Sequence, residues 1–339
     1  MKTLNFKKLI TSITQNVIFR MDEKNKKRLW LFLVVAFGIP AIMSIPMIIG
    51  AQNGIDIKMV ATMQMMYPAC GVILGMLLVN ENIGQIPRAG FITVLIITGL
   101  CTITGLWSIL DSGSKVANTV TDGLLTIGSL TTYILFWTCG RKKRENSGIE
   151  RKNIKSGAIL IGLFIVLYIS RSLILNYWKD SFLDFRNIET WSTLALAGMT
   201  FPLYFVLFFG EEYGWRYYLQ PILQQKFGII KGTLLLGVVW GLWYWNFIFT
   251  KTTGYQMLTY QIITCACLSI FLAYAYMKTG NIWVTIIMRF IFFVCGEMYI
   301  VEDIKLEWID LPWLLVSNLV FAVFIFAPVF KGKNQISNN

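Results

Sequence analysis

In the stretch FFGEEYGWRYYLQPIL, residues 208–223, Glu211 and Glu212 stand directly after an apolar run, and Arg216 follows one helical turn later. If one helix continues through it, Glu212 and Arg216 stand at i and i+4, the favoured orientation for an ion pair. Glu211 then projects about 100° away from Glu212, because a helix has 3.6 residues per turn. One helix can therefore offer a paired carboxylate and a free one. We expect Pro221 to end this helix, since proline removes a backbone donor.

The composition indicates that these charges lie in a membrane protein. The chain has 339 residues, of which 56% are hydrophobic and 14% charged, and its mean hydropathy is +0.61. A soluble domain has about 25% charged residues. A membrane span needs about 20 mostly apolar residues, and such runs fill the chain. We predict an all-α, polytopic helical bundle, with residues 29–339 as one transmembrane domain. About ten spans are expected, near 29–50, 59–79, 90–110, 122–140, 157–178, 191–210, 232–250, 258–277, 281–297 and 312–330.

The first 28 residues, MKTLNFKKLITSITQNVIFRMDEKNKKR, are basic and only partly apolar. Their apolar core is too short and too polar for a cleavable signal peptide, and no small-residue cleavage site precedes the first span. We expect them to form a basic amphipathic helix on the membrane surface.

The net charge of +12 does not indicate nucleic-acid binding, because the basic residues stand at the ends of apolar runs. Lysine and arginine in short loops mark the cytoplasmic side of a membrane. Most of them fall in segments that we place inside, namely 1–28, 80–89, 141–156, 211–231, 278–280 and 331–339. The sequence therefore predicts a multi-pass protein of the cell membrane with both termini in the cytoplasm.

The chain contains no histidine. This excludes histidine-ligated metals, Ser-His triads and histidine proton relays. All six cysteines lie within or beside apolar runs, and Cys265 and Cys267 have no accompanying ligands at metal-binding spacing. We expect no metal site and no cofactor.

Two further segments contain unusual residues for a membrane span. The segment GVVWGLWYWNFIF, residues 237–249, is rich in aromatic residues, and we expect Trp240, Trp243 and Asn246 to line a cavity. In GNIWVTIIMRFIFFVCG, residues 280–296, Arg289 stands well inside an apolar run. A buried arginine needs a partner, so we predict that it pairs with Glu211 or Glu212. The simplest interpretation of these charges is a structural ion-pair network.

Taken together, the three segments resemble the CPBP family, the type II CAAX-processing endopeptidases and their bacterial relatives, also called Abi or bacteriocin self-immunity proteins. GEEYGWRYYLQPIL is similar to the family's first motif, EExxxR, and the flanks of the other two motifs recur in the same order. The resemblance covers a core of about 190–297. It implies an intramembrane endopeptidase in which the first glutamate, Glu211, activates a water with the help of histidines. Glu212 and Arg216 complete that motif.

Three departures from the family pattern alter the expected chemistry. Tyr244 stands at the position of the second-motif histidine, Arg289 at that of the third-motif histidine, and Phe293 at that of the third-motif asparagine. A permanent cation beside Glu211 keeps that carboxylate ionised and tied into a salt bridge, which makes it a poorer general base. Arg289 could instead serve as an oxyanion donor.

The leading functional prediction is a membrane protein with a degenerate endopeptidase site. Besides membrane lipid, its partner would be a peptide, a lipidated peptide or a membrane protein, in an immunity or scaffold role. One alternative is an active glutamic endopeptidase that uses Glu211. Another is a transporter or a membrane acyltransferase, against which the chain shows neither repeated halves with broken helices nor a histidine base.

Overall fold

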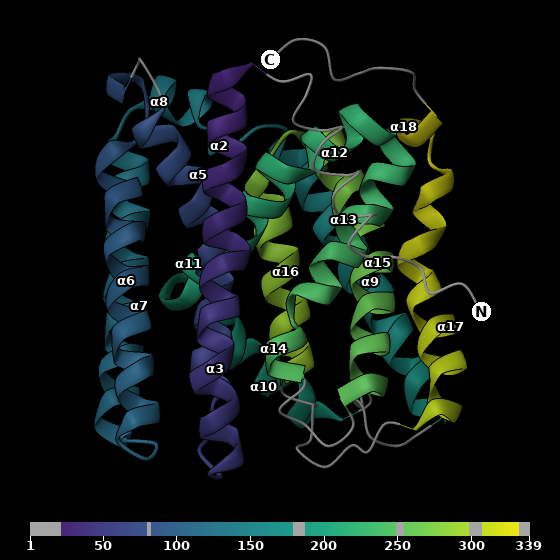
Figure 1. Cartoon of the computed structure of the whole chain (residues 1–339). Coiled ribbons are helices and arrows are strands. Elements are labelled where there is room, and N and C mark those ends of the chain that lie inside the picture. The colour runs from purple at the N-terminus through teal and green to yellow at the C-terminus, as the bar shows by residue number, and fades with distance from the viewer. Residues whose placement is uncertain (1–21, 80–82, 179–186, 249–253, 298–306, 332–339) are drawn as a thin grey trace, which may run out of the picture.

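The computed structural model describes residues 22–79, 83–178, 187–248, 254–297 and 307–331 (Figure 1). Over these ranges the chain forms helices joined by turns, without a β-strand, so the predicted all-α fold class is confirmed. The α-helices are α2 (Glu23–Leu33), α3 (Ile39–Gln52), α4 (Lys58–Met63), α5 (Tyr67–Leu78), α6 (Arg88–Leu110), α7 (Lys115–Thr138), α8 (Arg141–Asn146), α9 (Ile154–Trp178), α10 (Ile188–Met199), α11 (Phe201–Glu212), α12 (Gln220–Phe227), α13 (Ile229–Trp243), α14 (Trp245–Ile248), α15 (Gly254–Thr279), α16 (Ile282–Glu297), α17 (Leu311–Ala322) and α18 (Pro328–Lys331).

Several of these helices are joined without a break by tighter or wider turns. The π-helical segments are η1 (Val34–Gly38), between α2 and α3, and η4 (Tyr213–Leu219), between α11 and α12. Short 3₁₀ turns are η2 (Gln64–Met66), η3 (Ile83–Gln85), η5 (Trp308–Asp310) and η6 (Val323–Phe326).

Among the described residues, six helical segments are long and apolar enough to cross a membrane, and a bent pair of helices would make a seventh. The six are Glu23–Gln52, Lys58–Leu78, Arg88–Leu110, Ile154–Trp178, Gly254–Thr279 and Trp308–Phe326, and the bent pair is Ile188–Met199 with Phe201–Phe227. The protein is therefore multi-pass, but the number is lower than the ten or so spans that we predicted. The short helices α13 and α16 have 15 and 16 residues, fewer than the roughly 20 of a span. Helix α7 is long enough to cross a membrane, but its threonine, serine and glycine residues make it less apolar than the six candidate spans.

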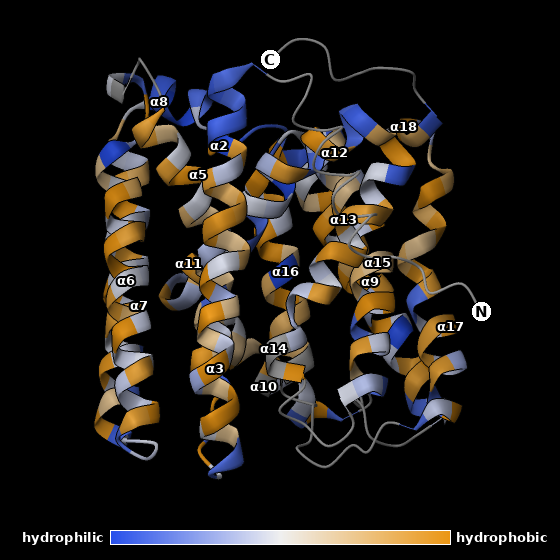
Figure 2. Cartoon of the chain, viewed as in Figure 1, coloured by the Kyte–Doolittle hydropathy of each residue, from blue (hydrophilic) through white to orange (hydrophobic). Residues whose placement is uncertain are grey.

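Basic segments gather at one end of the bundle. The start of α2 lies there with α8, α12 and α18 (Figure 1), and Figure 2 shows hydrophilic residues over this end. The turn that joins α6 to α7 lies at the opposite end. Residues 1–21 of the predicted amphipathic segment lie outside the described residues. Residues 23–28 are already part of α2, which continues through η1 into the first span.

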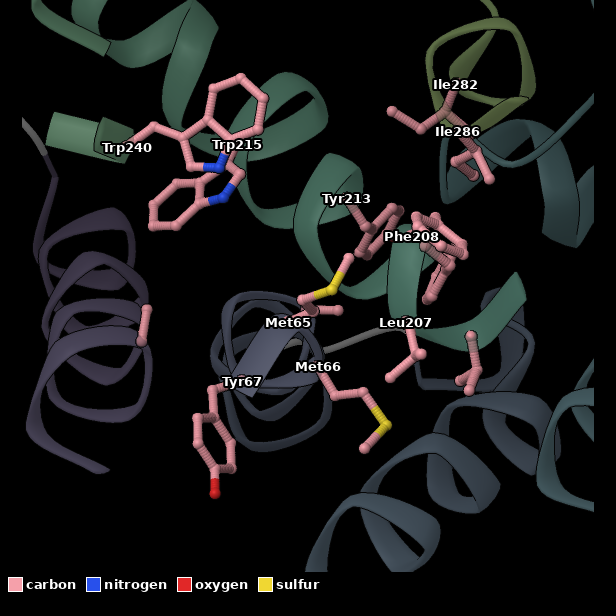
Figure 3. Close-up of a cluster of buried hydrophobic side chains, with 14 of the residues drawn as sticks. Met65, Met66, Tyr67, Leu207, Phe208, Tyr213, Trp215, Trp240, Ile282 and Ile286 are labelled. Atoms are coloured by element: carbon pink, nitrogen blue, oxygen red, sulfur yellow. The ribbon is translucent and has the colours of Figure 1, made fainter. Parts of the chain in front are cut away.

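Helix α11 and its continuation η4 run through the interior, where other helices surround them on several sides. Figure 3 shows Met65 and Met66 of η2 beside Leu207 and Phe208 of this helix. A side chain at Gly210 would collide with the backbone of η2, so a glycine is needed for this close approach. The helix that carries the two glutamates is therefore enclosed by its neighbours from residue 205 to residue 212, all of which are buried.

Helices α13 and α15 approach each other through glycines. A β-carbon at Gly237 would lie 2.5 Å from the α-carbon of Ala266, and one at Gly241 would lie 2.6 Å from the α-carbon of Ile262. Two small residues four apart form the small-xxx-small pattern by which membrane helices pack closely. This contact fixes the position of the aromatic residues at the end of α13.

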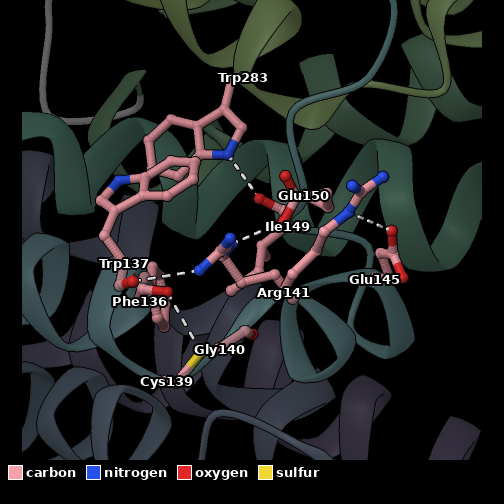
Figure 4. Close-up of polar contacts among 10 residues, drawn as sticks. Phe136, Trp137, Cys139, Gly140, Arg141, Glu145, Ile149, Glu150 and Trp283 are labelled. Atoms are coloured by element: carbon pink, nitrogen blue, oxygen red, sulfur yellow. Dashed lines mark hydrogen bonds and ion pairs between the residues drawn. The ribbon is translucent and has the colours of Figure 1, made fainter.

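A basic segment, residues 141–153, fastens two of the interior helices at the basic end (Figure 4). We call it the basic clasp. The indole N–H of Trp283, in α16, donates to the carbonyl oxygen of Ile149 at 2.7 Å. The hydroxyl of Tyr213, in η4, donates to the carbonyl oxygen of Ser147 at 2.8 Å. The clasp thus positions α16 and η4 relative to each other.

Candidate functional site

The first motif lies on one continuous helix that changes its winding directly after the glutamates. Helix α11 ends at Glu212, and η4 carries Arg216 in wider π-helical turns, in which the N–H of Gln220 donates to the carbonyl oxygen of Trp215, five residues back. The expectation that Pro221 ends the helix is wrong, because α12 continues through it to Phe227. Proline is tolerated in the first turn of a helix segment, and the π-helical turn places it there. Such π-segments within α-helices frequently occur at functional sites.

Glu211 has both carboxylate oxygens engaged and no exposed surface. Its Oε2 accepts a hydrogen bond from Arg289 Nε at 2.6 Å, within a buried salt bridge. Its Oε1 accepts hydrogen bonds from the hydroxyl of Tyr244 and, at 3.4 Å, from the indole N–H of Trp240. The predicted ion pair between Arg289 and one of the two glutamates is therefore present.

Tyr244 and Arg289 also contact each other. Arg289 donates from Nη2 to the Tyr244 hydroxyl at 2.7 Å, and that hydroxyl in turn donates to Glu211. The three side chains form a closed ring of hydrogen bonds drawn from α11, α16 and the end of α13. Both residues stand at positions where the family pattern has a histidine, so the substituted residues bind each other and the glutamate.

Glu212 forms a second buried ion pair on its own helix. Arg216 donates from Nε to Glu212 Oε2 at 3.2 Å, at the predicted i, i+4 spacing, and both side chains have no exposed surface. Arg216 Nη1 also donates to Ser269 Oγ at 2.9 Å. Glu212 Oε1 and Arg216 Nη2 have no hydrogen-bond partner among the described residues. Glu212 thus keeps one carboxylate oxygen unused, whereas Glu211 has none.

The indole of Trp240 joins the two ion pairs. The guanidinium carbon of Arg216 lies 4.8 Å from its ring centre and that of Arg289 lies 5.2 Å from it. Arginines at these distances are attracted by the electrons of an aromatic ring. Trp240 therefore lies close to both arginines, and its expected place in the lining of a substrate cavity stays a prediction.

The structure places the other predicted residues differently. Trp243 turns toward the first span, where its indole N–H donates to the carbonyl oxygen of Ala36 at 2.6 Å. Phe293 packs against Phe208, with ring centres 5.3 Å apart, and its described contacts do not include the carboxylates. Asn246 belongs to α14, and its side chain lies outside the described part of the structure.

Ser269 was missed by sequence reasoning. It accepts from Arg216 and donates to the carbonyl oxygen of Thr233 at 3.3 Å, which connects the site to α13 and α15. A serine in an apolar helix is also common at plain helix–helix contacts, so its spacing carried no signal of this role. Over the described residues, no group of three or more Cys, Asp or Glu side chains is placed to hold a metal ion.

These features define a class: a helical multi-pass membrane protein with two buried glutamate–arginine pairs at the junction of four helices. Residues 191–295 match the family model described as type II CAAX prenyl endopeptidase Rce1-like. The resemblance to the CPBP family is thereby confirmed over this part of the chain, which contains every residue of both ion pairs. Comparisons with curated proteins and with solved structures gave no match.

Proposed function

We propose that this protein is a non-catalytic relative of the CAAX-type endopeptidases that binds a peptide, a lipidated peptide or a membrane protein. The observation that carries the proposal is the ring formed by Glu211, Tyr244 and Arg289. The residue that would activate water in an endopeptidase is here a structural acceptor. Immunity and scaffold roles both fit a protein that binds without cleaving.

The chemical argument concerns the glutamate's lone pairs. A general base must lie within hydrogen-bond reach of the proton that it removes. The two oxygens of Glu211 already accept from Arg289, Tyr244 and Trp240, and the side chain has no surface exposed to water. Arginine stays protonated in proteins and cannot relay a proton. The chain has no histidine for that task.

We further propose that the basic end faces the cytoplasm and that both termini lie there, because lysine and arginine concentrate on the cytoplasmic side of membranes. The start of α2, the basic clasp and α18 share that end of the bundle. A partner that approaches from the cytoplasm would therefore meet the clasp before it reached the ion pairs.

A cleavage assay tests the central proposal. Purified protein in non-ionic detergent is incubated with prenylated and unprenylated membrane peptides, next to the variant Glu211→Ala. We expect no cleavage by either protein. Cleavage by the unchanged chain that is lost in Glu211→Ala would refute the non-catalytic role and establish the endopeptidase alternative.

Restoration of the family residues provides the matching positive experiment. The triple change Tyr244→His, Arg289→His and Phe293→Asn removes the permanent cation and returns the groups that the family pattern has at these positions. We expect this variant to gain peptide cleavage that depends on Glu211. Failure of a folded triple variant to cleave would show that more than these three side chains separates this site from an active one.

The unused oxygen of Glu212 favours a second candidate, an endopeptidase with a shifted base. Glu212 Oε1 is buried and has no partner among the described residues, so a water could be held there. If the unchanged chain does cleave peptides, Glu212→Gln and Glu211→Gln distinguish the two sites. Loss of cleavage in Glu212→Gln alone would assign the base to Glu212.

A further inference from the structure

A pocket of about 320 Å³ lies beside the ion pairs, among α4, α7, α11 and α16. Its volume is at the lower end of the range of small-molecule sites, about 300–1,000 Å³. Phe208 and Phe290 both line the pocket and pack edge to face, with ring centres 5.3 Å apart. Phe293, at the family's asparagine position, lines the pocket. The substitution to phenylalanine thus adds an aromatic ring to this second space.

One carboxylate stands in this mostly apolar lining. Asp122 belongs to α7, seven residues after Lys115, which is about 10 Å along the helix from its start. It has no hydrogen-bond or ion-pair partner among the described residues, and it is half-buried. A carboxylate that stands against apolar groups in a membrane protein is stabilised by a cation beside it. The group that would complement Asp122 is therefore a cation.

The aromatic rings favour the same ligand. Tyr204, Phe290 and Phe293 line the pocket together with Asp122. The face of an aromatic ring attracts an ammonium ion within about 6 Å, and cages of such rings recognise organic ammonium groups. An alkyl chain attached to the ammonium would lie against the same rings and gain from its removal from water.

Lys58 also lines the pocket, and its charge has to be considered. It is the first residue of α4. A lysine has a long aliphatic stem that can carry its ammonium toward water while the stem stays against apolar groups. The short side chain of Asp122 does not have that freedom. The carboxylate of Asp122 is therefore held at the pocket by its short side chain, whereas the ammonium of Lys58 stands at the end of a long one.

We propose that this pocket binds an organic ammonium ion, with Asp122 as its counter-ion and the rings of Tyr204, Phe290 and Phe293 around its apolar part. The site is separate from the glutamate–arginine pairs and does not depend on the proposed function. The carboxylate and the rings come from three different helices, so an occupant would contact α7, α11 and α16 at once.

Ligand-observed NMR titration of the full-length protein in non-ionic detergent tests the proposal, with n-butylammonium as the probe and n-butanol as its neutral counterpart. The variant Asp122→Asn keeps the shape of the side chain and removes its charge. Asp111→Asn is the matched control, because Asp111 is exposed at the end of α6. Phe293→Leu removes an aromatic face and leaves an apolar side chain.

We expect saturable n-butylammonium binding to the unchanged chain and to Asp111→Asn. Asp122→Asn should weaken it by about tenfold or more, and Phe293→Leu should weaken it several-fold. Binding of n-butanol should be weak and equal in all variants. Absence of saturable n-butylammonium binding to the unchanged chain would overturn the proposal, as would equal affinity in Asp122→Asn. Thermal unfolding of each variant verifies that it is folded.

Discussion

Glu211 and Arg289 form a buried salt bridge at the centre of the site. Both are buried, and Arg289 Nε donates a hydrogen bond to Glu211 within their salt bridge. Burial of two charges costs more free energy than their attraction returns unless the geometry is good and other hydrogen bonds help. Tyr244 supplies that help, because it donates to the carboxylate and accepts from the guanidinium.

The first residue-scale prediction concerns removal of one partner. Arg289→Ala leaves Glu211 buried and unpaired, and loss of one partner of a buried pair costs about 3–5 kcal/mol. We expect a decrease of that size in the free energy of unfolding, measured by denaturant titration in detergent. Arg141→Ala is the control, because Arg141 pairs with Glu145 at the surface and exposed pairs contribute less than about 1 kcal/mol.

A second prediction concerns rescue. The double variant Arg289→Ala with Glu211→Gln should recover part of the lost stability, since the stranded charge is gone. Arg289→Ala with Glu212→Gln should recover less, because Glu212 is paired with Arg216. A double-mutant cycle measures both couplings. Equal rescue by the two glutamine changes would contradict the assignment of separate pairs.

At this scale the sequence predicted the pairs but not every orientation. The i, i+4 spacing was sufficient to predict that Glu212 pairs with Arg216. The free-energy cost of an unpaired buried cation was sufficient to predict a carboxylate partner for Arg289. Trp243 and Phe293 were placed with the site because they belong to the segments that resemble the second and third family motifs. The directions of these two side chains depend on contacts with the α2–α3 segment and with α11. The residue spacing within one segment cannot predict contacts with another segment.

At the scale of elements, the site depends on how closely short helices approach longer ones. Helix α13 is held against α15 by Gly237 and Gly241, and α16 is held at its start by the basic clasp. Arg171 adds another link, because it donates from α9 to Asn318 of α17 and to Tyr260 of α15. Several separate contacts between helices therefore hold the helices that carry the ion pairs in place.

The element-scale prediction tests the glycine contact. In Gly241→Ala the new β-carbon would meet the backbone of Ile262 at 2.6 Å, so α13 must shift. Overpacking of this kind costs about 1–3 kcal/mol, and thermal unfolding should show it. Gly162→Ala is the matched control, because a β-carbon at Gly162 meets nothing within 4 Å; it should be neutral or stabilising by up to about 1 kcal/mol, since alanine favours helix. Equal effects of the two changes would contradict the close contact.

The sequence predicted helices throughout but not how they are joined or how long they are. The pattern of apolar residues indicates a helix but does not distinguish an α-helical turn from a π-helical one. The π-helical segment before Pro221, and the continuation of the helix past this proline, could therefore not be predicted. The number of spans was overestimated because α13 and α16 are apolar like spans but stop short. Their lengths are set by turns at Gly228 and Gly280, whose positive φ angles favour glycine.

At the scale of the whole molecule, the arrangement of charge along the bundle axis is the main feature. One end carries the start of α2, the basic clasp and α18, and the described turn between α6 and α7 lies at the other. The glutamate–arginine pairs lie between the two ends, enclosed by apolar side chains. The molecule thus has a basic face, an apolar belt and a charged interior.

The whole-molecule prediction concerns orientation in the membrane. Reporter fusions at Gly148, within the basic clasp, and at the C-terminus should both report the cytoplasm, because lysine and arginine mark that side. A fusion at Gly113, between α6 and α7, and one near residue 304 should report the outside. Opposite results for Gly148 and the C-terminus would mean an odd number of crossings and would contradict the proposed topology.

The closed ring at Glu211 makes its three members interdependent when the sequence changes. Replacement of Arg289 by an uncharged residue strands a buried carboxylate, and loss of the Tyr244 hydroxyl removes a donor from that carboxylate, so each single substitution lowers stability. The three positions are therefore expected to vary together among related sequences rather than one at a time, and the ring behaves as a single unit of sequence variation.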